Sequence, residues 1–340
     1  MNIDEQMKLV LRNIEEVVTE KELKDLLRKK KNPVMYIGAS ITGRPHIGYF
    51  MWVLKLADLV KAGFKVKVLL ADMHGALDNC PWDVLEKRYK YYAKVIPFMF
   101  EGIGANPNKI EFVKGSDFEL KKDYAFDVLN VSTFTSIRDC KKAASEVVKN
   151  VEGEKAKLSG LIYPIMQMLD EKYLEADMQF GATDQRKIFM FAREFHPKIG
   201  EKPRVELMGP MIPGLIGKKM SSSDEKGKVD LLDDEKKVLQ KIKGASCVAG
   251  DPDNGVMAFL KYIIMTLKGD KKEKFVVERD EKYGGNLEYE NYKQVEKDFV
   301  SKKLHPLDLK IAVAREINVL LKPMRDNEKI LDKVVNEGFS

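Results

Sequence analysis

Two short segments of the chain carry residue types suited to binding phosphate. The first reads Pro45-His46-Ile47-Gly48-Tyr49 and lies between a strand-like run and a helix-like run. A helix start presents unpaired backbone N–H groups and the positive end of the helix dipole, so it favours a bound anion. Gly48 leaves space for a flat base beside the backbone, and His46 can donate a hydrogen bond to a phosphate oxygen. Taken alone, a histidine at a helix start is more often a cap or a core residue.

The second segment, Gly217–Ser223, reads GKKMSSS and follows the first by roughly 170 residues. Lys218 and Lys219 place two ammonium groups on a loop, followed by the hydroxyls of Ser221 and Ser222. A flexible cation can follow the negative charge that builds on a departing pyrophosphate, and such stabilisation contributes about 3–4 kcal/mol per group. In isolation the segment could be a polar loop, but the two segments together favour a nucleotide site.

A third pattern is a row of polar residues on one helix. Tyr163, Gln167 and Asp170 are spaced i, i+4 and i+7, which places all three on one face. If that face is buried, its polar groups need partners, and a phenol hydroxyl together with an α-ammonium group would supply them. The alternative is a helix end whose polar side chains face solvent.

These residues must be positioned by a parallel sheet. Val34–Gly38 and, apart from Lys67, Val66–Ala71 are apolar runs, typical of strands buried on both faces, and the amphipathic run His46–Ala62 lies between them. Strand, helix and strand in this order predict a βαβ unit whose ligand site lies beyond the carboxyl ends of the strands. The residues expected at that edge are Tyr36, Gly38, His46 and Asp72.

The rest of the chain fits an α/β protein with a helical second domain. Apolar spacing predicts N-terminal helices from about Asp4 to Lys30, a helix over Trp82–Glu101, a strand at Ile110–Val113 and a long helical stretch from about Tyr124 to Val151. Lys-rich helices with few strand signals follow Asp230. We therefore predict N-terminal helices over 1–32, a Rossmann-like parallel-sheet catalytic domain over 33–230 with a helical insertion at about 115–162, and an α-helical domain over 231–340.

Composition narrows the class of protein. The chain is 44% hydrophobic and 33% charged, with no apolar run of membrane-spanning length. Its polar, acidic first residues differ from a secretory signal, so we expect a cytoplasmic protein. Cys80, Cys140 and Cys247 are widely separated, which argues against disulfides and a zinc site, and we expect no protein-bound metal. A net charge of +6 permits nucleic-acid binding without demonstrating it.

The first two segments resemble the signatures of one enzyme family. His46-Ile47-Gly48-Tyr49 is similar to the HIGH motif of class I aminoacyl-tRNA synthetases, with Tyr49 in place of the last histidine, and Lys219–Ser223 is similar to their KMSKS motif. The helix from Tyr163 to Asp170 closely resembles the tyrosyl branch of archaeal and eukaryotic type. The resemblance covers nearly the whole chain.

The resemblance implies a role for each matching residue. Tyr163 and Gln167 would face the substrate ammonium, and Asp170 would share the phenol hydroxyl with Tyr36. In Gly181–Lys187, Gln185 would contact the amine and Asp184 the ribose, although Ala182 departs from the family's glycine. The implied tyrosine-binding residues are Tyr36, Asp72, His74, Tyr163, Gln167, Asp170 and Gln185. The implied ATP-binding residues are Gly38, His46, Gly48, Asp184, Lys219, Ser221 and Ser222, and the implied catalytic residues are His46, Lys218 and Lys219.

The resemblance extends to the helical domain. Tyr283 would stack on the first anticodon base and Asp308 would accept hydrogen bonds from a guanine edge, whereas from the residues alone both positions lie in turns. The implied partners are tRNA(Tyr), L-tyrosine, ATP with its Mg²⁺ and a second copy of the chain, bound through the 115–162 insertion. No DNA or membrane partner is expected.

Three other functions are compatible with parts of the pattern. A tryptophanyl synthetase shares the architecture, but an indole N–H only donates and would not use both Tyr36 and Asp170. A catalytically idle RNA-binding relative would not need His46 and Lys219. A small-molecule adenylyltransferase would not explain the Lys-rich helical domain. Tyrosine-dependent ATP–pyrophosphate exchange distinguishes among them.

Overall fold

The computed structural model describes residues 1–148, 156–215 and 227–339. Its centre is a six-stranded sheet of order β1-β6-β5-β2-β3-β4, parallel except that β1 runs antiparallel to β6. The strands are β1 (Glu16–Val18), β2 (Val34–Ser40), β3 (Lys65–Ala71), β4 (Ile110–Lys114), β5 (Met178–Ala182) and β6 (Val205–Gly209). The predicted parallel α/β fold is confirmed.

The strand order changes direction between β2 and β5, where Tyr36 lies opposite Gln179. In open parallel sheets, this is the point at which the connections leave a crevice for ligands. Strand β2 is two residues longer than expected, so Tyr36 lies in the middle of the strand and not at its carboxyl end. The prediction for its position was wrong because the alanine and serine after Gly38 continue the ladder with β3.

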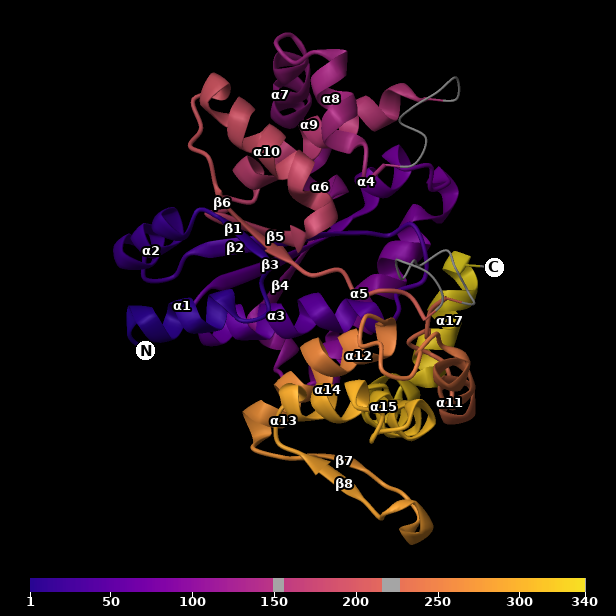
Figure 1. Ribbon diagram of the computed structural model, residues 1–340. Coiled ribbons are helices and arrows are strands. Elements are labelled where there is room, and N and C mark those ends of the chain that lie inside the picture. Colours follow the sequence, from indigo (N-terminus) through magenta and orange to yellow (C-terminus); the bar gives the residue numbers. More distant parts are fainter. Residues whose placement is uncertain (149–155, 216–226, 340) are drawn as a thin grey trace.

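Helices cover both faces of the sheet (Figure 1). The helices of the first 200 residues are α1 (Ile3–Leu11), α2 (Glu20–Lys29), α3 (Phe50–Lys61), α4 (Asp72–Leu77), α5 (Leu85–Gly102), α6 (Ser116–Glu119), α7 (Lys122–Ser132), α8 (Ile137–Ala144), α9 (Leu158–Tyr173) and α10 (Arg186–Phe195). Helices α3 and α5 pack on one side, and α9 and α10 pack together on the other. The short helix η1 (Ile47–Tyr49) leads directly into α3.

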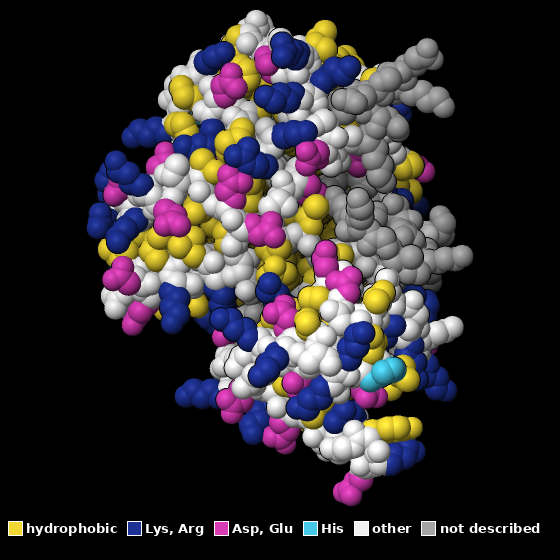
Figure 2. Space-filling view, in the orientation of Figure 1, with side chains coloured by type: hydrophobic (Ala, Val, Ile, Leu, Met, Phe, Trp, Pro, Cys, Tyr) yellow, Lys and Arg dark blue, Asp and Glu magenta, His cyan; other side chains and the backbone are white. Residues whose placement is uncertain are grey.

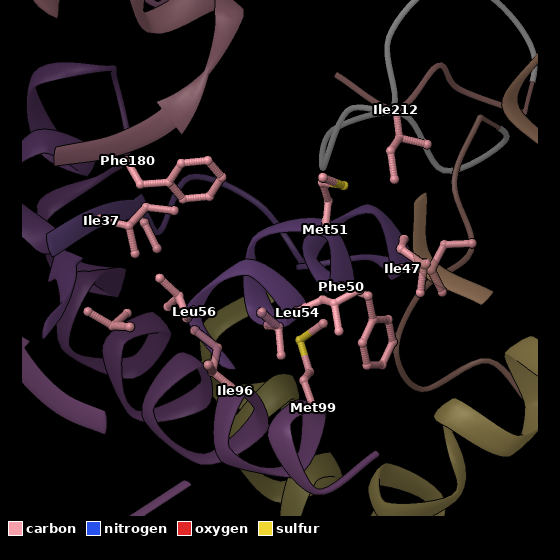
Figure 3. Close-up of a cluster of buried hydrophobic side chains, with 14 of the residues drawn as sticks. Ile37, Ile47, Phe50, Met51, Leu54, Leu56, Ile96, Met99, Phe180 and Ile212 are labelled. Carbon is pink, nitrogen blue, oxygen red and sulfur yellow. The ribbon is translucent and has the colours of Figure 1, made fainter. Parts of the chain in front are cut away.

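The packed centre explains why these elements form. Phe50, Leu54 and Leu56 of α3 face Ile96 and Met99 of α5 in one buried cluster (Figure 3). Full burial of such side chains contributes about 1.5–3 kcal/mol each. The helix start at residues 46–49 is therefore held by a rigid body.

The helical part that follows (Glu235–Phe339) packs beneath this body (Figure 1). Its helices are α11 (Glu235–Gly244), α12 (Gly255–Phe259), α13 (Met265–Lys271), α14 (Tyr292–Val300), α15 (Pro306–Leu320), α16 (Lys322–Asp326) and α17 (Glu328–Phe339). This part also contains a hairpin of β7 (Phe275–Val277) and β8 (Leu287–Tyr289), which was not predicted from the sequence. Helix α17 returns to pack along α5.

Two further expectations need correction. The N-terminal segment is not only helical, because residues 16–18 add an edge strand to the sheet. The long helical stretch from Tyr124 contains two described helices, and Ser136 begins the second one through a capping box with Asp139. The first correction concerns a strand of three residues, and the second concerns a break between two helices at residues 133–136.

Candidate active site

A cavity of about 360 Å³ opens where β2 and β5 meet. It brings together ten of the predicted site residues, which come from five separate parts of the chain. These are Tyr36, Gly38, His46, Gly48, His74, Tyr163, Gln167, Asp170, Asp184 and Gln185. A cavity of this size accommodates a small molecule.

The helix start forms one part of the cavity wall. His46 is the N-cap of η1, and its Nδ1 accepts a hydrogen bond from the Gly48 N–H at 3.1 Å. This bond assigns the ring proton to Nε2, the nitrogen that can then donate to an oxygen. The capping role that the sequence left open is therefore real, and it also sets a tautomer in which Nε2 can donate a hydrogen bond.

A second part of the wall is the Asp170 group, which comprises Tyr36, His74, Tyr163 and Asp170. Asp170 is 1% exposed, and its Oδ2 lies 2.8 Å from Nε2 of His74. The Tyr163 ring meets the His74 ring edge to face at 4.5 Å. The Tyr36 hydroxyl donates to the backbone carbonyl of Gln167 at 3.1 Å. Burial, followed by the charge of Asp170, raises the pKa of Tyr36 well above its ordinary value, so its phenol stays neutral.

Helix α9 presents the predicted polar row to the cavity. Tyr163, Gln167 and Asp170 all line it and are all buried, so the solvent-exposed alternative is excluded. The side-chain amide of Gln167 donates to Oε1 of Gln185 at 3.1 Å. This contact joins α9 to the segment that follows β5.

Two residues beside Asp170 were missed by sequence reasoning. The Tyr124 hydroxyl donates to Oδ1 of Asp170 at 2.7 Å, and Oε1 of Glu119 lies 3.5 Å from Nε2 of His74. Burial, followed by the charges of Asp170 and Asp72, raises the pKa of Glu119 to about 10, so this carboxyl group is neutral at pH 7. The available signal was position, since both residues follow strand β4 at the edge of the sheet that holds the site.

Asp72 lies outside the cavity and is a correction to the predicted pocket. Helix α4 begins at Asp72. The Oδ1 atom of Asp72 accepts a hydrogen bond from the Ser116 N–H at 2.8 Å. A Cβ added to Gly115 would lie 2.8 Å from that oxygen and 2.5 Å from Oε2 of Glu119. Asp72 therefore holds the turn that carries Glu119.

Comparison with known protein families shows the family to which the chain belongs. The model of class I tRNA synthetases that covers the tryptophan and tyrosine enzymes matches residues 28–322. The chain belongs to this family. A tyrosine–tRNA ligase from Haloarcula marismortui is 43% identical and covers 100% of the chain, which spans 98% of that protein. A cytoplasmic tyrosine–tRNA ligase from Danio rerio is 46% identical over 95% of the chain.

Solved structures agree with this membership. A tyrosyl-tRNA synthetase from Archaeoglobus fulgidus complexed with L-tyrosine has a TM-score of 0.87 at 39% identity, covering 96% of this chain and 99% of its own. The corresponding enzyme from Pyrococcus horikoshii has a TM-score of 0.91 at 30% identity, covering 99% of each chain. The chain spans only 60% of the Danio rerio relative and 62% of its Xenopus tropicalis counterpart.

Some residues matched to this family's motifs cannot be placed. Lys218, Lys219, Ser221 and Ser222 lie outside the described residues. The described chain resumes at Gly227 and immediately contacts the helix start. The Ile47 N–H donates to the Val229 carbonyl at 3.1 Å, and Arg44 pairs with Asp230 at 2.7 Å.

The residues that the family resemblance assigned to the anticodon lie in the helical part of the chain, and neither lines the cavity. Tyr283 is 66% exposed between β7 and β8, and Asp308 lies in the first turn of α15. Acidic and basic side chains are interspersed over the visible face of the helical part (Figure 2).

Within residues 1–148, 156–215 and 227–339, one group of histidine and acidic side chains has its ligand atoms within 4.8 Å of one another. The group comprises His74, Glu119 and Asp170. Because both Asp170 oxygens already accept hydrogen bonds from His74 and Tyr124, we interpret His74 and Asp170 as a hydrogen-bonded pair with the neutral carboxyl group of Glu119 beside it.

Proposed function

We propose that the chain is a tyrosine–tRNA ligase, which activates L-tyrosine with ATP and transfers it to tRNA(Tyr). The observation that carries the proposal is the buried Asp170 carboxylate beside Tyr36, in the same cavity as the helix start at His46 and Gly48. The Asp170 carboxylate suits a substrate hydroxyl that donates a hydrogen bond, and the neutral Tyr36 hydroxyl would donate to the same substrate oxygen once its proton turns away from the Gln167 carbonyl. The tyrosine-bound relative supports this assignment.

Tyrosine would lie with its phenol at Asp170 and Tyr36 and its ammonium near Tyr163, Gln167 and Gln185. Each carboxylate oxygen of Asp170 has two lone-pair directions, of which His74 and Tyr124 occupy one each. Capacity remains for a hydrogen bond from the substrate. Phenylalanine would leave this capacity unused in a dry site, which is a strong basis for rejection.

The first chemical step is the attack of the tyrosine carboxylate on the α-phosphorus of ATP. A new oxygen–phosphorus bond forms while the bond to the bridging oxygen breaks, and pyrophosphate leaves with that electron pair. In the second step, a hydroxyl of the terminal tRNA ribose attacks the acyl carbon, releasing AMP and a proton. No protein nucleophile is needed, so catalysis consists of positioning and electrostatic stabilisation.

Particular residues would supply this positioning and this electrostatic stabilisation. His46 would donate from Nε2 to a phosphate oxygen, as its cap hydrogen bond assigns. Gly38 and Gly48 line the cavity, and Asp184 would bind the ribose. Lys218, Lys219, Ser221 and Ser222 are proposed for the leaving pyrophosphate on the motif alone. Mg²⁺ would enter as part of the nucleotide substrate.

The assembly also belongs to the proposal. Five large apolar side chains on and beside α6 to α9 are each at least 66% exposed, namely Leu120, Phe126, Leu129, Ile137 and Leu158. Such a concentration suits an interface with a second copy of the chain, through the 115–162 insertion. The tRNA would then place its acceptor end at the catalytic domain (33–230) of one subunit and its anticodon on the 231–340 domain of the other subunit, at Tyr283 and Asp308.

The cytoplasm is the proposed location, because several relatives are named as cytoplasmic enzymes. In the part of the chain that the structure describes, no helix combines the length and apolar character needed to span a membrane.

The experiment is ATP–pyrophosphate exchange with each of the twenty amino acids. We expect exchange with tyrosine alone. Exchange driven by tryptophan would favour the tryptophanyl enzyme, and the absence of exchange with any amino acid would favour the idle RNA-binding relative.

A further inference from the structure

Arg88 on helix α5 connects two segments that are 296 positions apart in the chain. Its Nη1 donates to the backbone carbonyl of Thr42 at 2.6 Å, and its Nε donates to the carbonyl of Gly338 at 3.0 Å. The guanidinium group also lies over the Phe339 ring, 4.7 Å from its centroid. One rigid cation therefore contacts both the turn after β2 and the end of helix α17.

The turn held by Arg88 leads to the proposed nucleotide site. Residues 41–46 connect β2 to η1, and Thr42 lines the cavity. One helical turn further along α5, the Tyr92 hydroxyl donates to the Gly43 carbonyl at 2.5 Å and lies 3.3 Å from the Tyr49 hydroxyl. Arg88 and Tyr92 are spaced i and i+4, so they share one face of the helix. That face fixes carbonyls of the turn that sets the position of His46.

The other side of Arg88 is fixed by helix α17, which lies along α5 (Figure 1). Gly338 is close to α5, since an added Cβ would lie 3.3 Å from the backbone nitrogen of Arg88. The Phe339 ring also meets the Tyr91 ring at 5.6 Å. A long arginine side chain has many rotamers, and these contacts select the one that reaches Thr42.

We propose that Arg88 is a positioning residue for ATP, and that helix α17 supports the nucleotide site through it. The inference rests on the proposed function. Within the turn, α5 holds the carbonyls of Thr42 and Gly43, whereas the segment after Gly227 holds Arg44, whose carbonyl accepts from Lys228 at 3.4 Å. The first half of the turn therefore depends on α5. Tyrosine is bound by the Asp170 group, which Arg88 does not contact, so the effect should be confined to the nucleotide.

The test compares Arg88→Met, Arg88→Lys and Phe339→Ala with the control Lys87→Met, whose side chain is exposed on the same helix. We measure KM for ATP in tyrosine-dependent exchange, and separately the Kd for tyrosine without ATP. Arg88→Met should raise KM for ATP roughly tenfold with tyrosine Kd unchanged. Arg88→Lys should recover part of the loss, because an ammonium can reach only one side. Phe339→Ala should raise KM for ATP roughly threefold.

The double variant Arg88→Met/Phe339→Ala isolates the mechanism. If Phe339 acts through Arg88, the double variant should match Arg88→Met, whereas independent effects would multiply. Multiplying effects, or an equal loss of tyrosine affinity, would overturn the inference. If thermal melting shows that Arg88→Met does not fold, the KM for ATP of Phe339→Ala decides the test. Absence of exchange in the unmodified chain would instead refute the proposed function, and this inference with it.

Discussion

The Tyr124 hydroxyl lies 2.7 Å from Oδ1 of Asp170, while Nε2 of His74 lies 2.8 Å from Oδ2 of the same carboxylate. Asp170 is thus held from both sides before any substrate arrives. A buried acceptor with a fixed direction discriminates by geometry as well as charge, because a substrate hydroxyl must approach along the remaining lone pairs.

Tyr124→Phe tests the value of this orientation. Loss of one hydrogen bond to a charged group corresponds to about 1.5–3 kcal/mol, so we expect the tyrosine-over-phenylalanine ratio of kcat/KM to fall about 10-fold or more. The matched control is Tyr173→Phe, which removes a neighbouring hydroxyl bonded to Asp127 outside the cavity. Equal ratios for the two variants would show that Tyr124 only fills space.

Glu119→Gln tests the protonation state of the buried carboxyl group. The folded-state pKa, about 10, lies above the unfolded value, so the folded state binds the extra proton and stability falls as pH rises between the two values. Glutamine cannot titrate. We therefore expect the variant to gain stability relative to the unmodified chain as pH rises from 6 to 9, on the order of 1 kcal/mol per pH unit.

Chemical denaturation at several pH values measures this difference. The exposed Glu101→Gln serves as the control, and its stability should follow the unmodified chain at every pH. A constant difference for Glu119→Gln across the range would mean that Glu119 is ionised in the folded protein.

Phe126→Asp combined with Leu129→Asp tests the proposed homodimer. Two charges on an apolar interface are costly to bury, so sedimentation should change from dimer to monomer. Trp82→Asp is the control, since Trp82 is 70% exposed but lies outside the proposed interface. A monomeric unmodified chain that is active at assay concentration would exclude the dimer.

Asp308→Arg and Tyr283→Ala should impair the aminoacylation of tRNA in different ways. Arginine at 308 should reduce the preference for guanine at the first anticodon position, because it removes the acceptor of the guanine edge. Loss of the Tyr283 ring should weaken all tRNAs alike, by about 1–3 kcal/mol for one stack. Aminoacylation of four transcripts, one for each base, measures both effects. An unchanged ranking with Asp308→Arg would remove this residue from base reading.

The cavity could be predicted from the sequence because the residues that mark it form local and strong patterns. His46 and Gly48 start a helix after a buried strand, and the spacing of Gln167 and Asp170 marks one helix face. Sequence reasoning misplaced Asp72 because the strand end fixes where a residue lies but not where its side chain points. Helix α4 starts at this position and turns the carboxylate toward Ser116.

Other features left no periodic signal. The strands β1, β7 and β8 have three residues each, which is too short for alternation to be recognised. Tyr124 is one aromatic residue in a helical run, and its bond to Asp170 depends on the packing of α7 against α9. The neutral state of Glu119 likewise depends on burial beside two other carboxyl groups, which no linear pattern encodes.

The most direct test of the account is tyrosine-dependent ATP–pyrophosphate exchange by Asp170→Ala, compared with the exposed control Asp83→Ala. Thermal melting first establishes that both variants fold. The account predicts that Asp170→Ala lowers the tyrosine-over-phenylalanine ratio of kcat/KM by about 10–100-fold, as expected for the loss of a charged hydrogen-bond acceptor, and that the control leaves the ratio unchanged. An unchanged ratio in a folded Asp170→Ala variant would contradict the claim that this carboxylate recognises the phenol.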